Sequence, residues 1–80
     1  YLDYGMFLQS IMLAAVDEGL ATCPQASLGE YPDIIKEALG YPQDMVLIAG
    51  MALGYEDTNA PINSYRTSRL EVDEFTKFYN

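Results

Sequence analysis

The sequence contains no histidine, and its eighty residues include a single cysteine. The missing histidine excludes the serine–histidine and cysteine–histidine arrangements that activate a nucleophile, and it excludes a histidine-containing metal site. The lone Cys23 cannot form a disulfide within the chain, which favours a reducing, cytoplasmic setting. No second cysteine, histidine or nearby lysine stands beside it to stabilise a thiolate, so we expect a small buried or half-buried residue and no redox role.

Positive charge is also scarce. Four Lys and Arg residues stand against twelve Asp and Glu residues, and the formal net charge is −8. A nucleic-acid partner is therefore not expected, because neutralising phosphates requires clustered basic residues. Three of the four cations, Arg66, Arg69 and Lys77, fall in the last fifteen residues. An anion site is expected there, with the alternative that Arg66 and Arg69 are exposed or ion-paired with Glu71 or Asp73.

Nothing in these eighty residues marks the chain for export, and no hydrophobic run among them is long enough to cross a membrane. It begins at Tyr1 without a basic leader, so we expect its start to be a cut or processed end. The longest helical run, residues 6–16, is shorter than the roughly 20 apolar residues of a membrane span. We predict a helix here, with Asp3 near its N-terminus and Gly19 as the left-handed residue that ends it.

Only Gln9 and Ser10 interrupt this run, so the helix has no broad polar face. Such a helix is expected to be buried on most sides. Residues 21–27, which follow it, are predicted to form a loop.

A second helix of about eight residues is predicted to begin at Pro32 and to end at Gly40. Its expected apolar stripe consists of Ile34, Ile35, Ala38 and Leu39. On the opposite side, Lys36 and Glu37 are expected to face water.

Residues 45–53 form an unbroken apolar run between turn signals, which predicts a strand buried on both faces. No other stretch reads convincingly as a strand. A buried strand must pair its backbone groups. We therefore expect the fold to be completed by residues outside this chain, either an N-terminal part or a partner chain.

The C-terminal third begins with a polar, turn-rich surface connection at residues 56–63. Beyond it, Val72, Phe75 and Phe78 or Tyr79 are spaced for a short helix. These aromatic side chains are expected to pack on a partner or on residues outside the chain.

Six short motifs occur in a fixed order along the chain: Asp3-x-Gly5, Gln9, Leu13-Ala-Ala15, Gly19-Leu-Ala-Thr-Cys-Pro24, Ala52-Leu-Gly-Tyr55 and Asn63-x-x-Arg66-x-x-Arg69. Together they resemble the C-terminal half of the FMN-dependent nitroreductase family. The resemblance spans essentially the whole chain and implies an α+β, three-layer fold, with residues 1–80 as the C-terminal portion of a single domain.

The resemblance also implies an activity. Members of this family take hydride from NADH or NADPH onto FMN and pass electrons to nitroaromatics, quinones or related acceptors in a ping-pong cycle. They are homodimers with FMN at the subunit interface and with the long first helix at the dimer core. The alternative hypothesis is a non-enzymatic, acidic dimerisation or interaction module derived from the same fold.

Site residues follow from the same resemblance. Pro24, Gln25, Ala26 and Ser27 match the family segment whose backbone lies against the isoalloxazine ring, and Arg69 matches the arginine that binds the FMN phosphate. Arg66 is a candidate second positive charge, since Thr67 stands where many members have lysine. The family's N-terminal Arg-x-Ser-type segment, which forms the other half of the phosphate site, has no match in these eighty residues, so the chain is expected to be a fragment of such an enzyme. No side chain of this chain is expected to be catalytic.

Overall fold

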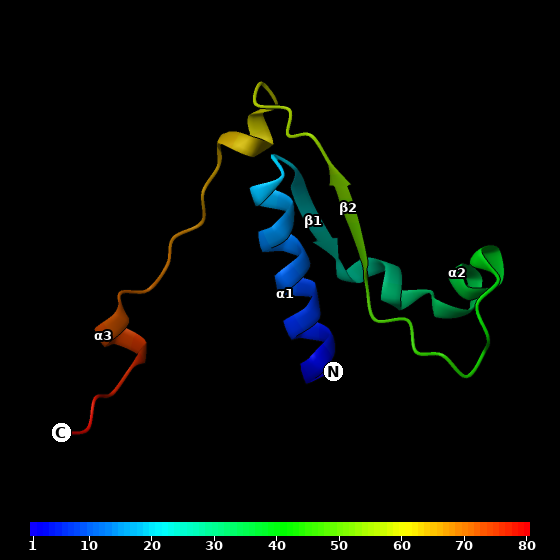
Figure 1. Ribbon diagram of the computed structural model, residues 1–80, viewed down its shortest axis with the longest axis horizontal. Coiled ribbons are helices and arrows are strands. Elements are labelled where there is room, and N and C mark those ends of the chain that lie inside the picture. Colours follow the sequence, from blue (N-terminus) through cyan, green and yellow to red (C-terminus); the bar gives the residue numbers. More distant parts are fainter.

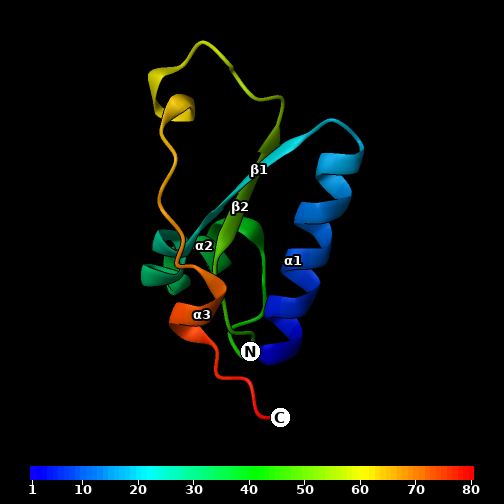
Figure 2. The same ribbon diagram turned by 90° about the vertical axis from the view of Figure 1, so that its left-hand side faces the viewer.

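The computed structural model describes all eighty residues. One long helix lies beside a two-stranded antiparallel sheet, and an extended C-terminal tail leads away from both (Figure 1). Figure 2 shows α1 along one side of the two strands. The elements in chain order are α1 (Leu2–Asp17), β1 (Ala21–Gln25), the 3₁₀ helix η1 (Ala26–Glu30), α2 (Pro32–Leu39), β2 (Gly50–Gly54), the 3₁₀ helix η2 (Pro61–Ser64) and α3 (Val72–Phe75).

Helix α1 confirms the prediction from the apolar run. Asp3 lies in its first turn, where a negative charge complements the helix dipole. Gly19 follows the helix with φ of 75°, a left-handed conformation that glycine adopts without steric cost. The N–H of Leu20 then donates to the backbone oxygen of Ala15 at 2.8 Å, which closes the end of the helix.

Burial of α1 on most sides is not found within this chain. Its covered residues recur every three or four positions and form one stripe: Tyr4, Leu8, Ile11, Met12 and Ala15. The opposite side is open to solvent, because the only sheet beside the helix has two strands. The large apolar side chains exposed there are Leu2, Met6, Phe7, Leu13 and Val16.

Strand β1 corrects the prediction of a loop at residues 21–27. Ala21 to Gln25 pair with Gly54 to Gly50 in antiparallel register. Strand β2 therefore has a partner strand within this chain, contrary to the prediction that its partners lie outside it. The signal was weak because Pro24 is a poor strand former, and because the paired residues lie 25 to 33 positions further along the chain. Both outer edges of the sheet remain unpaired.

Strand β2 is shorter than the predicted strand at residues 45–53. It covers Gly50–Gly54, and residues 45–49 have no regular structure. The physical reason is pairing: β1 supplies partners for five residues only, and an apolar sequence cannot form a strand ladder without a neighbour.

Helix α2 has the predicted bounds, with Pro32 at its start and Gly40 in a left-handed conformation at its end. The prediction for its faces is confirmed for Glu37, which is exposed, and for Ile35, which is half-buried, but it was wrong for the other residues. Lys36 is only 7% exposed, whereas Ile34 and Leu39 of the expected apolar stripe are 67% and 63% exposed. Lys36 is buried because its ammonium group finds backbone acceptors in the following loop, as described below.

The C-terminal tail contains only short elements. Residues 56–60 are irregular, as expected for a surface connection, and α3 ends at Phe75, before the predicted Phe78 or Tyr79. Glu71 and Glu74 form a capping box that stabilises this single turn. Figure 1 shows the chain between η2 and the C-terminus running away from the sheet, so the tail does not pack on the other elements.

The chain leaves much of its surface uncovered. Its radius of gyration is 16.9 Å, against about 12 Å for a compact domain of this length. Its accessible surface is 7334 Å², roughly 2,500 Å² more than a folded monomer of this mass exposes. Only Ala15 and Lys36 are buried, each with 7% of its surface exposed. No helix has both the length and the apolar character that crossing a membrane requires.

Candidate functional site

The 24–27 segment, which consists of Pro24, Gln25, Ala26 and Ser27, lies where β1 gives way to η1. Its first two residues end the strand, and its last two begin the 3₁₀ helix. All four residues are exposed. The backbone here is therefore accessible to a ligand, while β1 fixes one end of the segment through its pairing with β2.

Close packing fixes the other end of the segment. Leu28 lies over Gly50, so that a Cβ built on this glycine would overlap the Cδ1 atom of Leu28. Gly29 approaches the backbone of Ile48 closely enough that a side chain there would meet the Ile48 carbonyl. The start of η1 thus packs against the residues that lead into β2.

Arg66 lies at the opposite end of β1. It lines an open hollow together with the last turn of α1, the first residues of β1 and the connection after β2. No hydrogen bond or ion pair involves its guanidinium group. The residues that line this hollow together with Arg66 include Val16, Thr22, Glu56 and Asn63.

Arg69 lies in the stretch between η2 and α3, which Figure 1 shows leaving the sheet. Its Nη1 atom donates to Thr67 Oγ1 at 2.6 Å and to the backbone oxygen of Ser68 at 3.0 Å. It forms no ion pair with Glu71 or Asp73, and both Arg66 and Arg69 are exposed, as the alternative of exposed arginines expects. The structure therefore holds the 24–27 segment as one unit but does not bring either arginine to it.

Cys23 is exposed, which corrects the prediction of a buried or half-buried residue. It sits opposite Ala52 in the two-stranded sheet, and no further strand or helix covers its side chain.

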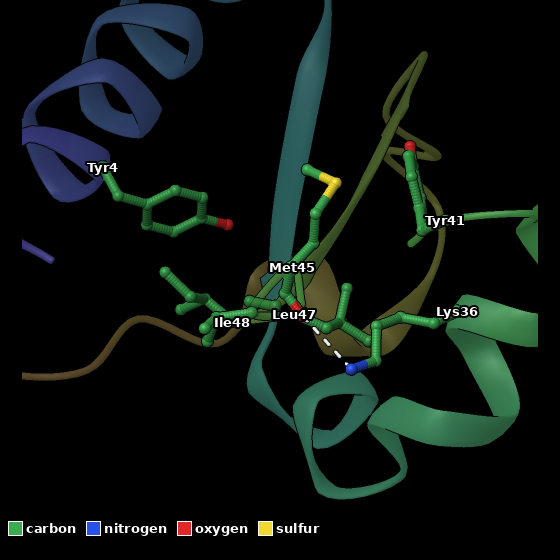
Figure 3. Close-up of a pocket in the computed structure, with 8 residues that line it drawn as sticks. Tyr4, Lys36, Tyr41, Met45, Leu47 and Ile48 are labelled. Atoms are coloured by element: carbon green, nitrogen blue, oxygen red, sulfur yellow. Dashed lines mark hydrogen bonds between the residues drawn. The ribbon is translucent and has the colours of Figure 1, made fainter. Parts of the chain in front are cut away.

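The feature that sequence reasoning missed is the environment of Lys36. Figure 3 shows its side chain extending from α2 toward Met45, with Tyr4 of α1 on the far side of the same pocket. Its Nζ atom donates to the backbone oxygens of Gln43 at 3.1 Å and Met45 at 3.2 Å. Asp33 lies 3.8 Å away, although its carboxylate is well exposed.

This pocket encloses about 190 Å³ and is mainly apolar. The signal that could have identified Lys36 is its position after Ile35 and one turn before Leu39: a long aliphatic stem can be buried beside apolar residues if its ammonium group reaches polar acceptors. The lining residues are Tyr4, Lys36, Tyr41, Met45, Val46, Leu47, Ile48 and Ala49.

Comparison with known proteins gives one consistent result. Residues 1–55 match the family described as the nitroreductase family. Over 78 residues the chain is 45% identical to a 4-nitrobenzoate reductase of Pseudomonas putida and 42% identical to a chloronitrobenzene nitroreductase of Comamonas testosteroni. Each alignment covers 98% of this chain, including the two arginines that lie beyond the family match, but 34% of the relative.

Solved structures agree. The FMN- and NADPH-dependent nitroreductase NfnB from Sphigopyxis sp. strain HMH superposes with a TM-score of 0.93 at 38% identity, over 99% of this chain and 35% of that one. The FMN-dependent NfnB from Mycobacterium smegmatis, solved in complex with NADPH, gives a TM-score of 0.92 at 37% identity, over 98% of this chain and 35% of the other. The chain thus spans about one third of the length of the relatives that it matches.

Proposed function

Because this chain belongs to the nitroreductase family, we propose that its eighty residues form part of an oxidoreductase that uses FMN and NADPH to reduce nitroaromatic compounds. Its helix-and-strand arrangement is the α+β, nitroreductase-like fold expected from the sequence. The observation that carries the proposal is the superposition of 99% of the chain on an FMN- and NADPH-dependent nitroreductase at 38% identity. Since this match covers one third of that protein, the activity is proposed for the complete enzyme, meaning these residues together with the rest of the fold.

The chemistry of the available donors fits FMN. The exposed backbone of the 24–27 segment offers N–H groups at a fixed strand end, which suits the polar edge of a flat ring system. Arg69 has no carboxylate partner, so its charge remains available for a phosphate, which a planar guanidinium can bind through two parallel hydrogen bonds. Arg66 is likewise unpaired and is proposed as a second positive charge near the phosphate.

When bound, FMN supplies the chemistry, because it can accept hydride from NADPH and pass electrons to a nitro group. The residues of this chain hold and orient it: the 24–27 segment donates from its backbone, and Arg69 neutralises the phosphate. None of the side chains of the segment has an acid–base role in this proposal.

A homodimer with FMN at the subunit interface is also proposed. Helix α1 exposes five large apolar side chains, and large exposed apolar patches mark surfaces that bind another protein. The excess exposed area of roughly 2,500 Å² is large compared with the about 800 Å² that each partner buries in a standard interface. Part of it is therefore available for a second subunit, and part for the segment that completes the sheet.

The setting is proposed to be the cytoplasm, which agrees with a single free cysteine. We propose quinones and related compounds as further electron acceptors besides nitroarenes, with NADH as the alternative donor to NADPH.

The test is a spectrum and a turnover measurement on the complete enzyme. The purified protein should show the visible absorbance of bound flavin. Without oxygen, NADPH should reduce this flavin once, and sustained NADPH oxidation should require an added nitroarene such as 4-nitrobenzoate. Omitting the nitroarene and replacing NADPH by NADH are the controls. A colourless protein that stays inactive after FMN is supplied would overturn the proposal and favour a non-enzymatic dimerisation module.

A further inference from the structure

Two contacts made by the ends of the candidate site converge on Gly50. Gln25, inside the 24–27 segment, is paired with Gly50 across the two-stranded sheet. Leu28, the residue directly after the segment, places its Cδ1 atom where a side chain of Gly50 would begin. Ala26 and Ser27 therefore span two residues that are both anchored on the same glycine.

Space, and not backbone conformation, explains the glycine at this position. Only Gly19 and Gly40 have positive φ values, so the backbone of Gly50 is one that any residue can adopt. Gly54, at the other end of β2, has nothing within 4 Å of a built Cβ. The two glycines of the same strand thus differ in one respect. The side chain of Leu28 occupies the space that a Cβ of Gly50 would need, whereas the space beside Gly54 is empty.

We propose that Gly50 is a positioning residue for the flavin-facing backbone, because its missing side chain lets Leu28 clamp the 24–27 segment. This inference rests on the proposed function, since it assumes that the segment faces FMN. Strand pairing holds one end of the segment and the packing of Leu28 holds the other, so the backbone N–H groups of Ala26 and Ser27 are presented in one conformation before a ligand arrives. A segment that is ordered in advance loses less conformational entropy on binding.

The first test compares Gly50→Ala with Gly54→Ala in the complete enzyme. Gly50→Ala displaces Leu28 and is expected to raise the dissociation constant for FMN about tenfold. It is also expected to speed amide hydrogen exchange in peptides covering residues 24–28 of the FMN-free enzyme. Gly54→Ala, the matched control on the same strand, should leave both values near those of the wild type. Equal FMN affinity and equal exchange in the two variants would overturn the proposal.

A double substitution tests the clamp directly. The Cβ built on Gly50 lies 3.7 Å from the Cβ of Leu28, an ordinary contact, so Leu28→Ala makes room for an alanine at position 50. Leu28→Ala alone removes the packing and should weaken FMN binding and speed exchange. The double variant should lie closer to the wild type in both measurements than Gly50→Ala does, because substitutions in contact are not additive. If the double variant shows the plain sum of the single effects, the clamp is wrong.

The same measurements separate this proposal from the proposed function. If the wild-type enzyme binds no FMN at all, the function fails, while the exchange rates still report whether Gly50 and Leu28 order the segment. If the wild type binds FMN and Gly50→Ala and Leu28→Ala leave both affinity and exchange unchanged, the function stands and the positioning role fails. If Gly50→Ala does not fold, Leu28→Ala tests the positioning role alone through FMN affinity and hydrogen exchange, because it introduces no clash.

Discussion

Lys36 donates a hydrogen bond from its Nζ atom to the backbone oxygen of Met45 at 3.2 Å. A second bond, to the backbone oxygen of Gln43 at 3.1 Å, comes from the same nitrogen. Together they fasten α2 to the irregular residues that lead into β2. Because β2 carries Gly50, this contact also supports the strand on which the candidate site is built.

Replacing Lys36 by methionine should destabilise the complete enzyme. The aliphatic stem is kept, but two part-buried hydrogen bonds from the ammonium group to the backbone oxygens of Gln43 and Met45 are lost. Losing hydrogen bonds from a charged donor costs about 1.5–3 kcal/mol. Urea denaturation measures the change, and Lys77→Met is the control, since Lys77 is exposed and contacts only the ring of Tyr79, at 5.1 Å. Equal stability of the two variants would show that the bonds of Lys36 contribute nothing.

Replacing Arg69 by alanine should weaken FMN binding. A charge-assisted hydrogen bond to a phosphate contributes about 1.5–3 kcal/mol, which corresponds to roughly a 10- to 150-fold rise in the dissociation constant. Arg69→Lys keeps the charge but loses the planar, two-bond geometry, so its effect should be intermediate. Flavin fluorescence reports the binding. An alanine variant with wild-type affinity would remove Arg69 from the site.

A carboxylate on the solvent-exposed side of α1 should dissociate the proposed homodimer. Leu13 is 63% exposed in this chain, and Leu13→Glu would place a charge inside an apolar interface. We expect the dimer dissociation constant to rise at least about a hundredfold, an effect of roughly 2.7 kcal/mol. Analytical ultracentrifugation measures it, and Thr58→Glu adds the same charge on the polar connection as a control. A Leu13→Glu enzyme that remains dimeric at the same concentrations would place the interface elsewhere.

Gly40→Ala should lower stability by about 1 kcal/mol, because this glycine ends α2 with φ of 73° and a Cβ disfavours that conformation. Asparagine tolerates left-handed backbone better, so Gly40→Asn should cost less than Gly40→Ala. Thermal unfolding of the two variants gives the order. If alanine proved as stable as glycine, the left-handed ending of α2 would be contradicted.

Local signals predicted the two longest helices of this fold, α1 and α2. The apolar run with Asp3 and Gly19 fixed α1, and the proline and glycine at either end of Pro32–Leu39 fixed α2, because helix ends are determined by nearby residues. Strand β1 escaped prediction because its partner lies far along the chain, and Pro24 weakens its local signal. A strand exists only where another backbone pairs with it, and no local pattern carries that information.

The candidate site was predictable in part. The 24–27 segment came from family resemblance, and the structure places it on a defined strand end. Burial of Lys36 was missed because the helical pattern assigns lysine to the solvent face, whereas two carbonyl acceptors in a later loop reverse that assignment. The placement of Arg69 depends on where the tail packs, which the eighty residues alone do not determine because nothing among them covers that tail.

The most direct test of the central claim is a titration of the complete enzyme, stripped of flavin, with FMN, followed by flavin fluorescence. Saturable binding of one FMN per chain, weakened by Arg69→Ala and by Gly50→Ala but not by Gly54→Ala, is the predicted result. Absence of saturable binding would contradict the assignment of this chain to a flavin site.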